Sequence, residues 1–446
     1  MSSTAPMPTT ALASTKASKG KVFAWALWDW GTQPFASVIT TFVFAVYLVS
    51  DAFGDPDERT KQLAWATAVA GIFIALLAPV LGQGSDRRGR RMFNLRWQTW
   101  ALAIISAAMY FVAPSPEYFW LGAILLAGGN IVQEIANVNY YAAIDQVSTP
   151  RNVGRVSGLG WGLGYLGGIT ILLLIIVVRG SDFSASDVRI AMLICGAWTL
   201  LFTIPLFVTV KDKRPDHPVP SLGVIGSYRE LIASIRRLWR TTPNTIFFLV
   251  ASALFRDGLA GVFTFGGILA AVTFGFEFSE VVTFGVVANV VAGVATMLFG
   301  LLDDRIGPKK VIIFSLICLV LLGTGVFVFH DGGKPVFWAL GLLMCLFVGP
   351  AQSASRSFLA RLMPDGMSGE IFGLYATTGR AVSFLSPLLF GVGIIIGQAV
   401  LGSSEEGAQY WGILGIVVVL LLGLVVAIFV KQPPKAAELE ATLEAD

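Results

Sequence analysis

The chain has 446 residues, of which 55% are hydrophobic and only 13% are charged. A soluble protein carries roughly a quarter of charged residues, so this composition excludes an ordinary soluble domain. The formal net charge of +3 is small, and the lysines and arginines lie in short segments between apolar runs. The sequence therefore contains no basic domain suited to a nucleic acid, and we do not expect one as a partner.

Apolar runs of about 20 residues recur along the whole length, and each is long enough to cross a bilayer as an α-helix. Uninterrupted aliphatic stretches such as ILLLIIVV favour helices, because a barrel strand that faces lipid alternates between apolar and polar residues. The sequence predicts an all-α integral membrane protein. Its twelve expected transmembrane helices span residues 23–50, 62–84, 92–113, 118–142, 154–179, 190–210, 244–271, 280–302, 309–329, 335–361, 369–397 and 408–430.

The expected helices fall into two groups of six. The longest polar stretch between helices separates them, and its later part, SYRELIASIRRLW, is basic and amphipathic, which is typical of a helix lying on a membrane surface. We therefore expect five regions: a disordered cytoplasmic tail at 1–21, an N-terminal six-helix bundle at 22–210, a cytoplasmic linker with an amphipathic helix at 211–243, a C-terminal six-helix bundle at 244–431 and a cytoplasmic tail at 432–446.

The basic residues indicate the orientation in the membrane. If the N-terminus is inside, 23 lysines and arginines lie in cytoplasmic segments and five lie on the opposite side. The positive-inside rule then places both termini in the cytoplasm. The compact loops and the absence of a recognisable targeting segment favour a bacterial plasma membrane. The three cysteines fall in expected helices and the two histidines lie far apart, so we expect neither a disulfide framework nor a metal site.

Two short motifs occur once in each half of the chain. The loop motif, GQGSDRRGRR after the second expected helix and GLLDDRIGPKK after the eighth, aligns Gly82 with Gly300, Asp86 with Asp304, Arg87 with Arg305 and Gly89 with Gly307. The helix-start motif, GRVSGLG in the fifth helix and GEIFGLY in the eleventh, aligns Gly154 with Gly369 and Gly158 with Gly373. Two motifs repeated in the same order predict two pseudo-symmetric bundles related by an axis along the membrane normal.

The loop motif also has a mechanical interpretation. Its glycines allow helices to approach closely, and Asp86 can meet the N-terminal end of a neighbouring helix or a nearby arginine. Such a cluster can hold the cytoplasmic side closed and break when that side opens. The alternative is a basic loop that only sets topology, but two copies at matched positions favour a gate. The candidate gating residues are Gly82, Asp86, Arg87, Gly89 and Arg90 in one copy and Gly300, Asp304, Arg305 and Gly307 in the other.

The paired Gly-x-x-x-Asp-Arg-x-Gly loops resemble the hallmark loop of the major facilitator superfamily. More narrowly, WALWDW, GRVSGLGWGLGYLGG, FLVASALFRDG and SRSFLARLMPDGMSGEIFGLYATTGR resemble the branch that includes the vacuolar amino-acid effluxers linked to autophagy and their bacterial relatives. The resemblance implies the major facilitator fold and solute transport by efflux or release. One stretch departs from it: after WDW the relatives carry a small residue, Asn and Ser, whereas this chain reads Gly31-Thr32-Gln33-Pro34, which points to a different substrate.

Several expected helices carry polar residues in an otherwise apolar sequence. An ionised side chain at the bilayer centre costs roughly 2.5–3.5 kcal/mol on insertion scales, so these residues should face the bundle interior or one another. Asp29, Gln33, Ser37 and Thr40 share one face of an ideal helix. The candidate substrate and coupling residues are Asp29, Gln33, Glu134, Asn137, Arg256, Asp257, Gln352 and Arg380.

Structural alternatives remain beside these assignments. Asp29 and Asp257 occupy comparable places in the two halves, and each either lines the pathway or belongs to a buried ion pair. Of the adjacent Arg256 and Asp257, about 100° apart on a helix, we expect one to face the cavity. Arg356 is interpreted as a gate or a topology charge. Trp25, Trp28 and Trp30 either line the cavity or anchor the helix at the interface. The glycines of the fifth helix indicate close helix packing.

The main functional hypothesis is a secondary active transporter that moves a small polar solute, amino acids being one class, by alternating access. No ATP-binding loop is present, so a proton or substrate gradient would supply the energy. We expect no cofactor, no catalytic residues and a monomer whose partners are its substrate, the lipid bilayer and protons. Two alternatives stay open: an exporter of amphipathic drugs or lipids, and a membrane-embedded enzyme or sensor, which the sequence disfavours.

Overall fold

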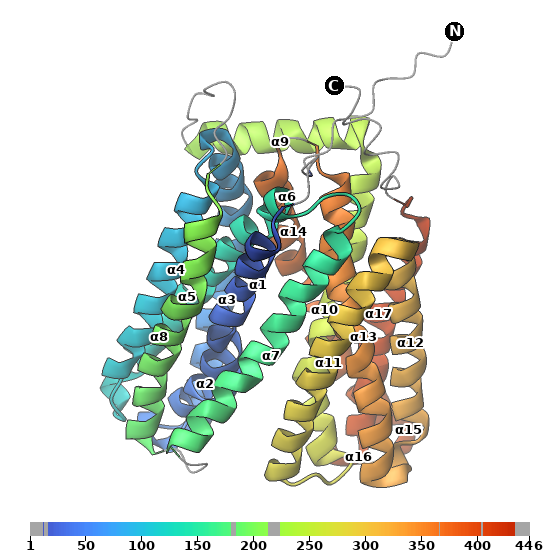
Figure 1. Ribbon diagram of the computed structural model, residues 1–446. Coiled ribbons are helices and arrows are strands. Elements are labelled where there is room, and N and C mark those ends of the chain that lie inside the picture. Colours follow the sequence, from blue (N-terminus) through green and yellow to red (C-terminus); the bar gives the residue numbers. More distant parts are fainter. Residues whose placement is uncertain are drawn as a thin grey trace. The chain divides into compact units, whose positions relative to one another are not determined.

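The computed structural model describes residue 12 and residues 17–179, 184–212, 224–364, 366–402 and 405–432. Of the expected tails at 1–21 and 432–446, the described residues are 12, 17–21 and 432, and the first helix begins at Lys19, inside the segment expected to be disordered. The elements of the described part are helices (Figure 1). The longer ones are α1 (Lys19–Pro34), α3 (Pro56–Arg88), α4 (Arg91–Ala108), α5 (Phe119–Ala142), α7 (Val153–Arg179), α8 (Ala185–Thr209), α9 (Val224–Thr241), α10 (Pro243–Val272), α11 (Phe278–Ile306), α12 (Pro308–Val328), α13 (Gly333–Leu362), α14 (Ser368–Val382), α15 (Leu385–Leu401) and α17 (Gly412–Phe429).

Shorter helical segments connect these elements. They are the π-helix η1 (Phe35–Phe42), the α-helices α2 (Phe44–Leu48), α6 (Ile144–Val147) and α16 (Glu405–Ala408), and the 3₁₀ turns η2 (Asp51–Phe53), η3 (Met109–Phe111), η4 (Pro116–Tyr118), η5 (His330–Gly332) and η6 (Gln409–Trp411). This all-helical organisation confirms the predicted fold class.

The chain divides into two compact units. Unit 1 comprises residues 1–149, 163–231 and 363–377, and unit 2 comprises residues 150–162, 232–362 and 378–446. The first part of α7 therefore belongs to unit 2, and most of α14 belongs to unit 1. The bundles expected at 22–210 and 244–431 account for most of each unit but not for these two exchanged segments.

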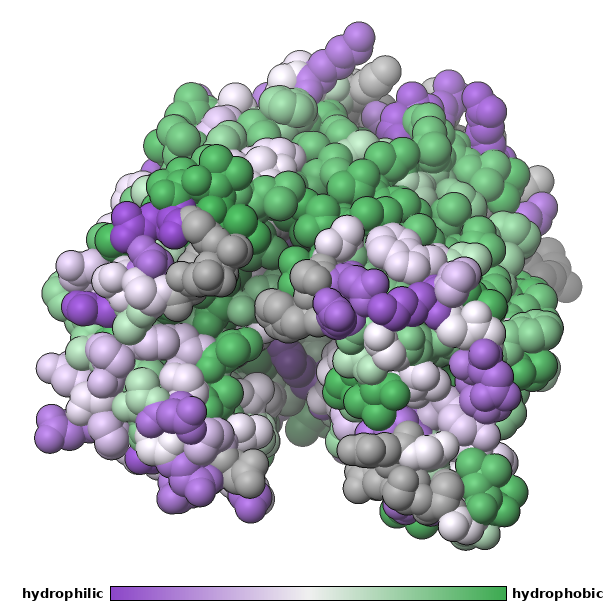
Figure 2. Space-filling view, turned by 90° about the horizontal axis from the view of Figure 1, so that it is seen from below, coloured by the Kyte–Doolittle hydropathy of each residue, from purple (hydrophilic) through white to green (hydrophobic). Residues whose placement is uncertain are grey.

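Eleven helical stretches of the described chain are long and apolar enough to cross a membrane. They match eleven of the twelve predicted spans, and α4 corresponds to the twelfth. The first two turns of α4 contain Arg91, Asn94, Arg96 and Gln98, which lowers its hydropathy. Large apolar side chains are exposed along the helices, among them Trp65, Val177 and Phe429, and Figure 2 shows hydrophobic residues over wide areas of one face. Such a surface requires lipid rather than water.

The first predicted helix, 23–50, is not one continuous α-helix. It changes after Pro34 into η1, where the hydroxyl of Thr40 donates to the carbonyl of Phe35, five residues back, at 2.9 Å. Pro34 has no amide hydrogen and so weakens the α-helical pattern at this point. A π-turn contains one residue more than an α-helical turn. The prediction that Thr40 lies on the same helix face as Asp29 assumed a continuous α-helix, and it therefore does not hold beyond Ser37.

The eleventh predicted helix, 369–397, is also interrupted. It consists of α14 and α15 with a break at Ser383 and Phe384. Pro387 explains the break, because it lacks the amide hydrogen that would bond to the carbonyl of Ser383 and its ring crowds that carbonyl. The hydroxyl of Ser383 instead donates to the carbonyl of Arg380 at 3.0 Å. The first turn of α15 consequently lies within the apolar stretch. The backbone amides of that turn have no acceptor within the helix and need a partner from elsewhere.

Candidate functional site

In unit 1, Asp29 of α1 lies beside an aromatic stack. The hydroxyl of Tyr140, from α5, donates to Asp29 Oδ2 at 2.9 Å. The ring of Tyr140 stacks on Trp25 and on Trp28, with centroid distances of 4.5 and 4.2 Å. The indole nitrogen of Trp25 donates to the carbonyl of Tyr140 at 3.1 Å, and that of Trp28 donates to Thr99 Oγ1 at 3.0 Å. The phenol is thus held in place, and Asp29 receives a rigidly positioned hydrogen-bond donor.

The burial of the tryptophans changes their interpretation. Trp25 and Trp28 are both fully buried, so neither is an interfacial anchor or an open cavity wall. They act inside unit 1 as supports for Tyr140. Trp30 has a different environment, because its carbonyl accepts a hydrogen bond from the indole of Trp198 at 3.2 Å.

The polar face of α1 packs directly on glycines of α7. A Cβ atom added to Gly164 would lie 3.6 Å from Cβ of Asp29, and one added to Gly168 would lie 2.9 Å from Cγ of Gln33. The hydroxyl of Ser37 also approaches the carbonyl of Gly168 at 3.5 Å. A Cβ atom at Gly168 would crowd Gln33, whereas one at Gly164 would only make an ordinary contact with Asp29. The close approach of α1 to α7 therefore depends on Gly168.

The other candidate residues of unit 1 lie on α5. Glu134 and Asn137 are half-buried, and the side-chain amide of Gln133 donates to Asn137 Oδ1 at 3.1 Å. Helix α5 thereby carries both these polar residues and Tyr140, one to two turns apart. The structure joins α5 to Asp29 through Tyr140.

In unit 2, Asp257 of α10 is a buried residue that caps the second half of the broken helix. Its Oδ2 accepts a hydrogen bond from the amide of Ser386 at 2.7 Å, within the first turn of α15. One turn further along α10, a Cβ atom on Gly261 would lie 3.0 Å from Cβ of Ser386. Arg256 is half-buried next to Gly379. Asp257 therefore supplies the partner that the break at Pro387 requires.

Removing this cap should destabilise unit 2. We expect Asp257→Ala to lower the free energy of unfolding by about 1 kcal/mol or more, the usual value of an N-cap, while Asp257→Asn retains an oxygen acceptor and stays close to the wild type. Thermal unfolding of the purified protein in detergent would measure both variants. Equal destabilisation by Asn and Ala would show that the side-chain acceptor is not what matters.

Gln352 and Arg380 are half-buried residues of α13 and α14. Arg356, one turn after Gln352, is almost fully buried and binds the start of α7 within unit 2: its Nε donates to Ser157 Oγ at 2.9 Å and its Nη2 to the carbonyl of Ser157 at 2.7 Å. The buried guanidinium thus has specific acceptors, which a residue that only sets topology would not need.

The first loop motif forms a charged cluster in unit 1, the Asp86 cluster, which consists of Asp86, Arg91, Asp145 and the amides of Gly369 and Glu370. Asp86, at the end of α3, accepts the amide of Gly369 at 2.7 Å and that of Glu370 at 3.1 Å. Arg91 pairs with Asp86 at 2.7 Å and with Asp145 at 2.8 Å. A carboxylate at the start of α14 is favourable because that helix end carries unpaired amides and partial positive charge.

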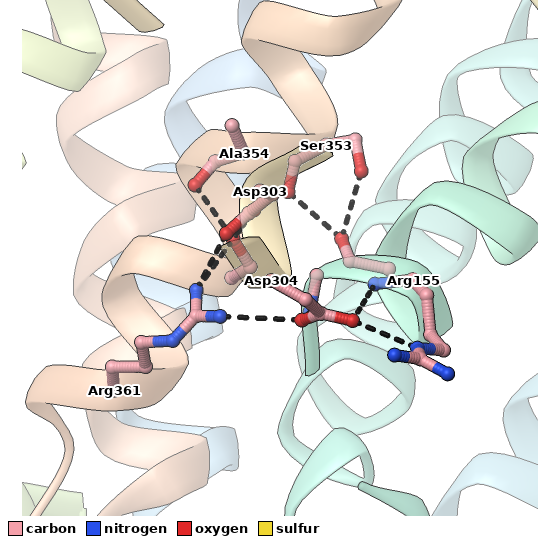
Figure 3. Close-up of polar contacts among 9 residues, drawn as sticks. Arg155, Asp303, Asp304, Ser353, Ala354 and Arg361 are labelled. Carbon is pink, nitrogen blue, oxygen red and sulfur yellow. Dashed lines mark hydrogen bonds and ion pairs between the residues drawn. The ribbon is translucent and has the colours of Figure 1, made fainter. Parts of the chain in front are cut away.

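The second loop motif forms the Asp304 cluster in unit 2, which consists of Asp303, Asp304, Arg155, Ser357, Arg361 and the amides that open α7 (Figure 3). Asp304 accepts the amides of Gly154 at 2.7 Å and Arg155 at 3.2 Å, and the guanidinium of Arg155 at 2.9 Å. Arg361 pairs with Asp303 at 2.8 Å and with Asp304 at 3.3 Å. The hydroxyl of Ser357 also donates to Asp303.

The loop motif and the helix-start motif therefore bind each other, and this contact occurs once in each unit. The aspartate of each loop motif binds the amides of the helix-start motif that belongs to the other half of the sequence. Glycines allow this approach: a Cβ atom on Gly300 would lie 2.8 Å from the carbonyl oxygen of Gly154, and one on Gly369 would lie 2.6 Å from that of Gly82. The sequence predicts both motifs but not that they bind each other.

The remaining residues of the loop motif have unequal roles. Gly89 and Gly307 end α3 and α11 with positive φ angles of 56° and 91°, which glycine adopts without strain. Arg87 pairs with Glu230 of α9 at 3.6 Å, whereas the aligned Arg305 is exposed. Arg90 lies over the ring of Phe93 at 5.9 Å.

Sequence reasoning missed several members of these sites. Tyr140 lies off the polar stripe of α5, and Arg361 counts in the sequence as a cytoplasmic topology charge. Arg91 and Asp303 lie within the two copies of the loop motif, so their position is a signal that could have found them. Among the described residues, no group of three or more His, Cys, Asp or Glu side chains is arranged to hold a metal ion.

The helical units, the two matched clusters and the apolar exterior define an integral membrane protein of the major facilitator type. Three solved structures have this fold. A bacterial homologue of the iron transporter ferroportin is 17% identical (TM-score 0.65, 92% of this chain and 98% of that chain). The proton:xylose symporter XylE is 12% identical (0.71, 95% and 98%), and the human organic anion transporter MFSD10 is 16% identical (0.71, 92% and 99%).

The model of the vacuole effluxer Atg22-like family matches residues 142–440, and the chain belongs to this family. The uncharacterized MFS-type transporter YxiO of Bacillus subtilis (strain 168) is 26% identical over 421 residues, which are 92% of this chain and 94% of that protein. Autophagy-related protein 22 of Yarrowia lipolytica (strain CLIB 122 / E 150) is 26% identical over 355 residues, and autophagy-related protein 22-1 of Neosartorya fischeri is 27% identical over 262. These two matches cover 72% and 53% of this chain and 58% and 43% of the fungal proteins, so the chain spans about half the length of these fungal relatives.

These similarities confirm the predicted family and fold. The chain is a membrane transporter of the major facilitator superfamily, and the family and the bacterial relative that it matches are described as transporters rather than enzymes.

Proposed function

We propose that the chain is a secondary active transporter that exports a small polar solute by alternating access, with Asp29 at its substrate or coupling site. The observation that carries the proposal is the geometry of Asp29: a half-buried carboxylate in a transmembrane helix, with a hydroxyl donor that an aromatic stack holds in place. Ionisable residues in a membrane span are costly and mark substrate or proton pathways.

The nature of the neighbouring side chains supports a polar solute. Gln33 and Ser37 continue the polar face of α1 from Asp29, and Asn137 and Glu134 lie on α5, the helix that supplies Tyr140. These groups offer donors and acceptors of the kind that bind an amino group or a carboxylate. In the second half, Arg256 and Arg380 are cations suited to a carboxylate, since guanidinium binds it in a bidentate manner. Amino acids, which carry both charges, are the class to test first, and the family description as effluxer favours export.

The Asp86 and Asp304 clusters are proposed as the gate. The Asp86 cluster holds the start of α14 and the Asp304 cluster holds the start of α7, each by charge-assisted hydrogen bonds. In the proposed gate, water replaces these bonds when the cluster opens. Gly82 and Gly300 let the helices approach closely enough for these bonds, and Arg87, Gly89, Arg90, Arg305 and Gly307 complete the loops. Their duplication in the two units is what a rocking mechanism between repeats requires.

The proposal includes the location and energy source. The bacterial relative matches along nearly its whole length, which favours a bacterial plasma membrane, and the excess of basic residues on one side favours cytoplasmic termini. We take a proton gradient coupled through Asp29 as the energy source. We take the transporter as a monomer, because each unit supplies its own polar residues.

The test is a search for a ligand followed by transport. Purified protein is screened for thermal stabilisation by a solute library that contains all amino acids, and each hit is assayed by counterflow in liposomes. We expect a polar solute that both stabilises and exchanges. If the protein moves amphipathic drugs or fluorescent lipids but no polar solute, it is instead an exporter of amphipathic compounds. If the folded protein moves no solute of either kind, the proposal is contradicted.

A further inference from the structure

Helix α9, in the segment between the two sets of membrane spans, has three distinct faces. One face is buried and carries Leu231, Ser234 and Leu238. A second face is apolar and open: Ile225, Ile232 and Trp239 follow one another at intervals of seven residues and are 74%, 51% and 55% exposed. Side chains seven apart lie on nearly the same line of an α-helix. An apolar line left open in this way indicates a partner other than water.

A basic face adjoins the apolar line. Arg229 and Arg236 stand four residues after Ile225 and Ile232, and Arg240 directly follows Trp239, so the three guanidinium groups run along the same side. All three arginines are exposed, as is Arg237. The single acidic residue of the helix, Glu230, pairs with Arg87. The open part of α9 therefore combines apolar side chains with a net positive charge.

The attachments of α9 place it against membrane spans. In unit 1 the hydroxyl of Tyr228 donates to the carbonyl of Leu76 in α3 at 2.9 Å. In unit 2 the ring of Trp239 lies 5.7 Å from that of Phe247 in α10. Leu76 and Phe247 are themselves about half exposed on their transmembrane helices. Each part of α9 thus contacts a span on a side that is open to lipid.

We propose that α9 is a docking surface for an anionic phospholipid leaflet. Ile225, Ile232 and Trp239 enter the boundary between head groups and acyl chains, and Arg229, Arg236 and Arg240 bind phosphate groups. Apolar insertion combined with basic side chains is the physical basis of amphipathic helix binding to membranes, and each arginine near an anionic surface strengthens association about fivefold. Because α9 contacts α3 and is joined to α10 through Thr242 alone, lipid composition would act on the segment that joins the two sets of spans.

The experiment compares hydrogen exchange of the α9 amides in full-length protein in two lipid nanodiscs, one of phosphatidylcholine alone and one that also contains phosphatidylglycerol. We expect exchange across residues 225–240 to slow by at least about tenfold in the anionic discs, and the difference to shrink in high salt, because salt screens exposed charges. The triple variant Arg229→Gln, Arg236→Gln and Arg240→Gln should lose the difference, whereas the matched triple replacement by lysine should keep most of it.

Exchange in the transmembrane helices controls for folding of each variant. Equal protection of α9 in the two nanodiscs, or a difference that persists in the glutamine variant, would overturn the proposal. The proposal would also be overturned if the α9 amides were protected from exchange by an added acidic protein segment but not by phosphatidylglycerol. The wild-type comparison with and without salt decides the question even if a variant does not fold, and none of these readouts depends on the transported solute.

Discussion

Arg361→Met should destabilise the protein by about 3–5 kcal/mol, the usual cost of removing one partner from a buried ion pair. Asp303, which is 1% exposed, faces Arg361 at 2.8 Å, and methionine leaves that carboxylate buried without its cation. The same change also removes a donor from Asp304. The midpoint of thermal or denaturant-induced unfolding in detergent would measure the effect.

Two variants make this prediction specific. Arg305→Met changes an exposed arginine at the end of the neighbouring α11 and should shift stability by no more than about 0.5 kcal/mol. Adding Asp303→Asn to Arg361→Met removes the stranded charge and should restore a large part of the loss. An Arg361 variant as stable as the Arg305 control would mean that the Asp304 cluster does not hold unit 2 together.

Asp29→Asn should reduce transport of the identified solute by at least about tenfold, while the protein unfolds at nearly the wild-type temperature. Asparagine has the same shape and can still accept the hydrogen bond from Tyr140, so the change removes charge and proton exchange rather than packing. A hydrogen bond to a charged group is worth about 1.5–3 kcal/mol, which corresponds to a factor of ten or more. Counterflow in liposomes and ligand-induced thermal stabilisation would measure the two effects.

Further variants separate a functional from a structural role of Asp29. Tyr140→Phe keeps the ring on Trp25 and Trp28 but removes the donor, so we expect a smaller loss of transport with little change in stability. Asp331→Asn, the same substitution at a side chain that is 94% exposed, is the matched control and should be neutral. Full transport by the Asp29 variant would assign that carboxylate to structure and turn attention to Glu134 and Arg380.

Much of the fold and part of the candidate site could be predicted from the sequence. Apolar segments of sufficient length determine the membrane class, because a span must hide its own backbone polar groups. The repeated loop and helix-start motifs indicate two related halves, and their residues, such as Asp86 and Gly369, do lie at the clusters. Pro387 and Pro34 mark where the eleventh and first predicted helices are interrupted, since a proline removes an amide hydrogen. These are local properties of the sequence, although the predicted spans 23–50 and 369–397 treated both interrupted helices as continuous.

The tertiary structure alone decided which of these features bind each other. Asp86 and the amide of Gly369 are 283 residues apart in the chain, and Asp29 and Tyr140 are 111 residues apart. Helical periodicity indicates which residues share a face, but not which other helix meets that face or at what height. The exchange of α7 and α14 segments between the units, the support of Tyr140 by two tryptophans and the pairing of Arg361 with Asp303 all follow from packing at a distance. Sequence thus determined the class, the spans and the motifs, and tertiary structure determined the partners, because hydrophobicity acts locally whereas hydrogen-bond partners depend on how distant helices pack.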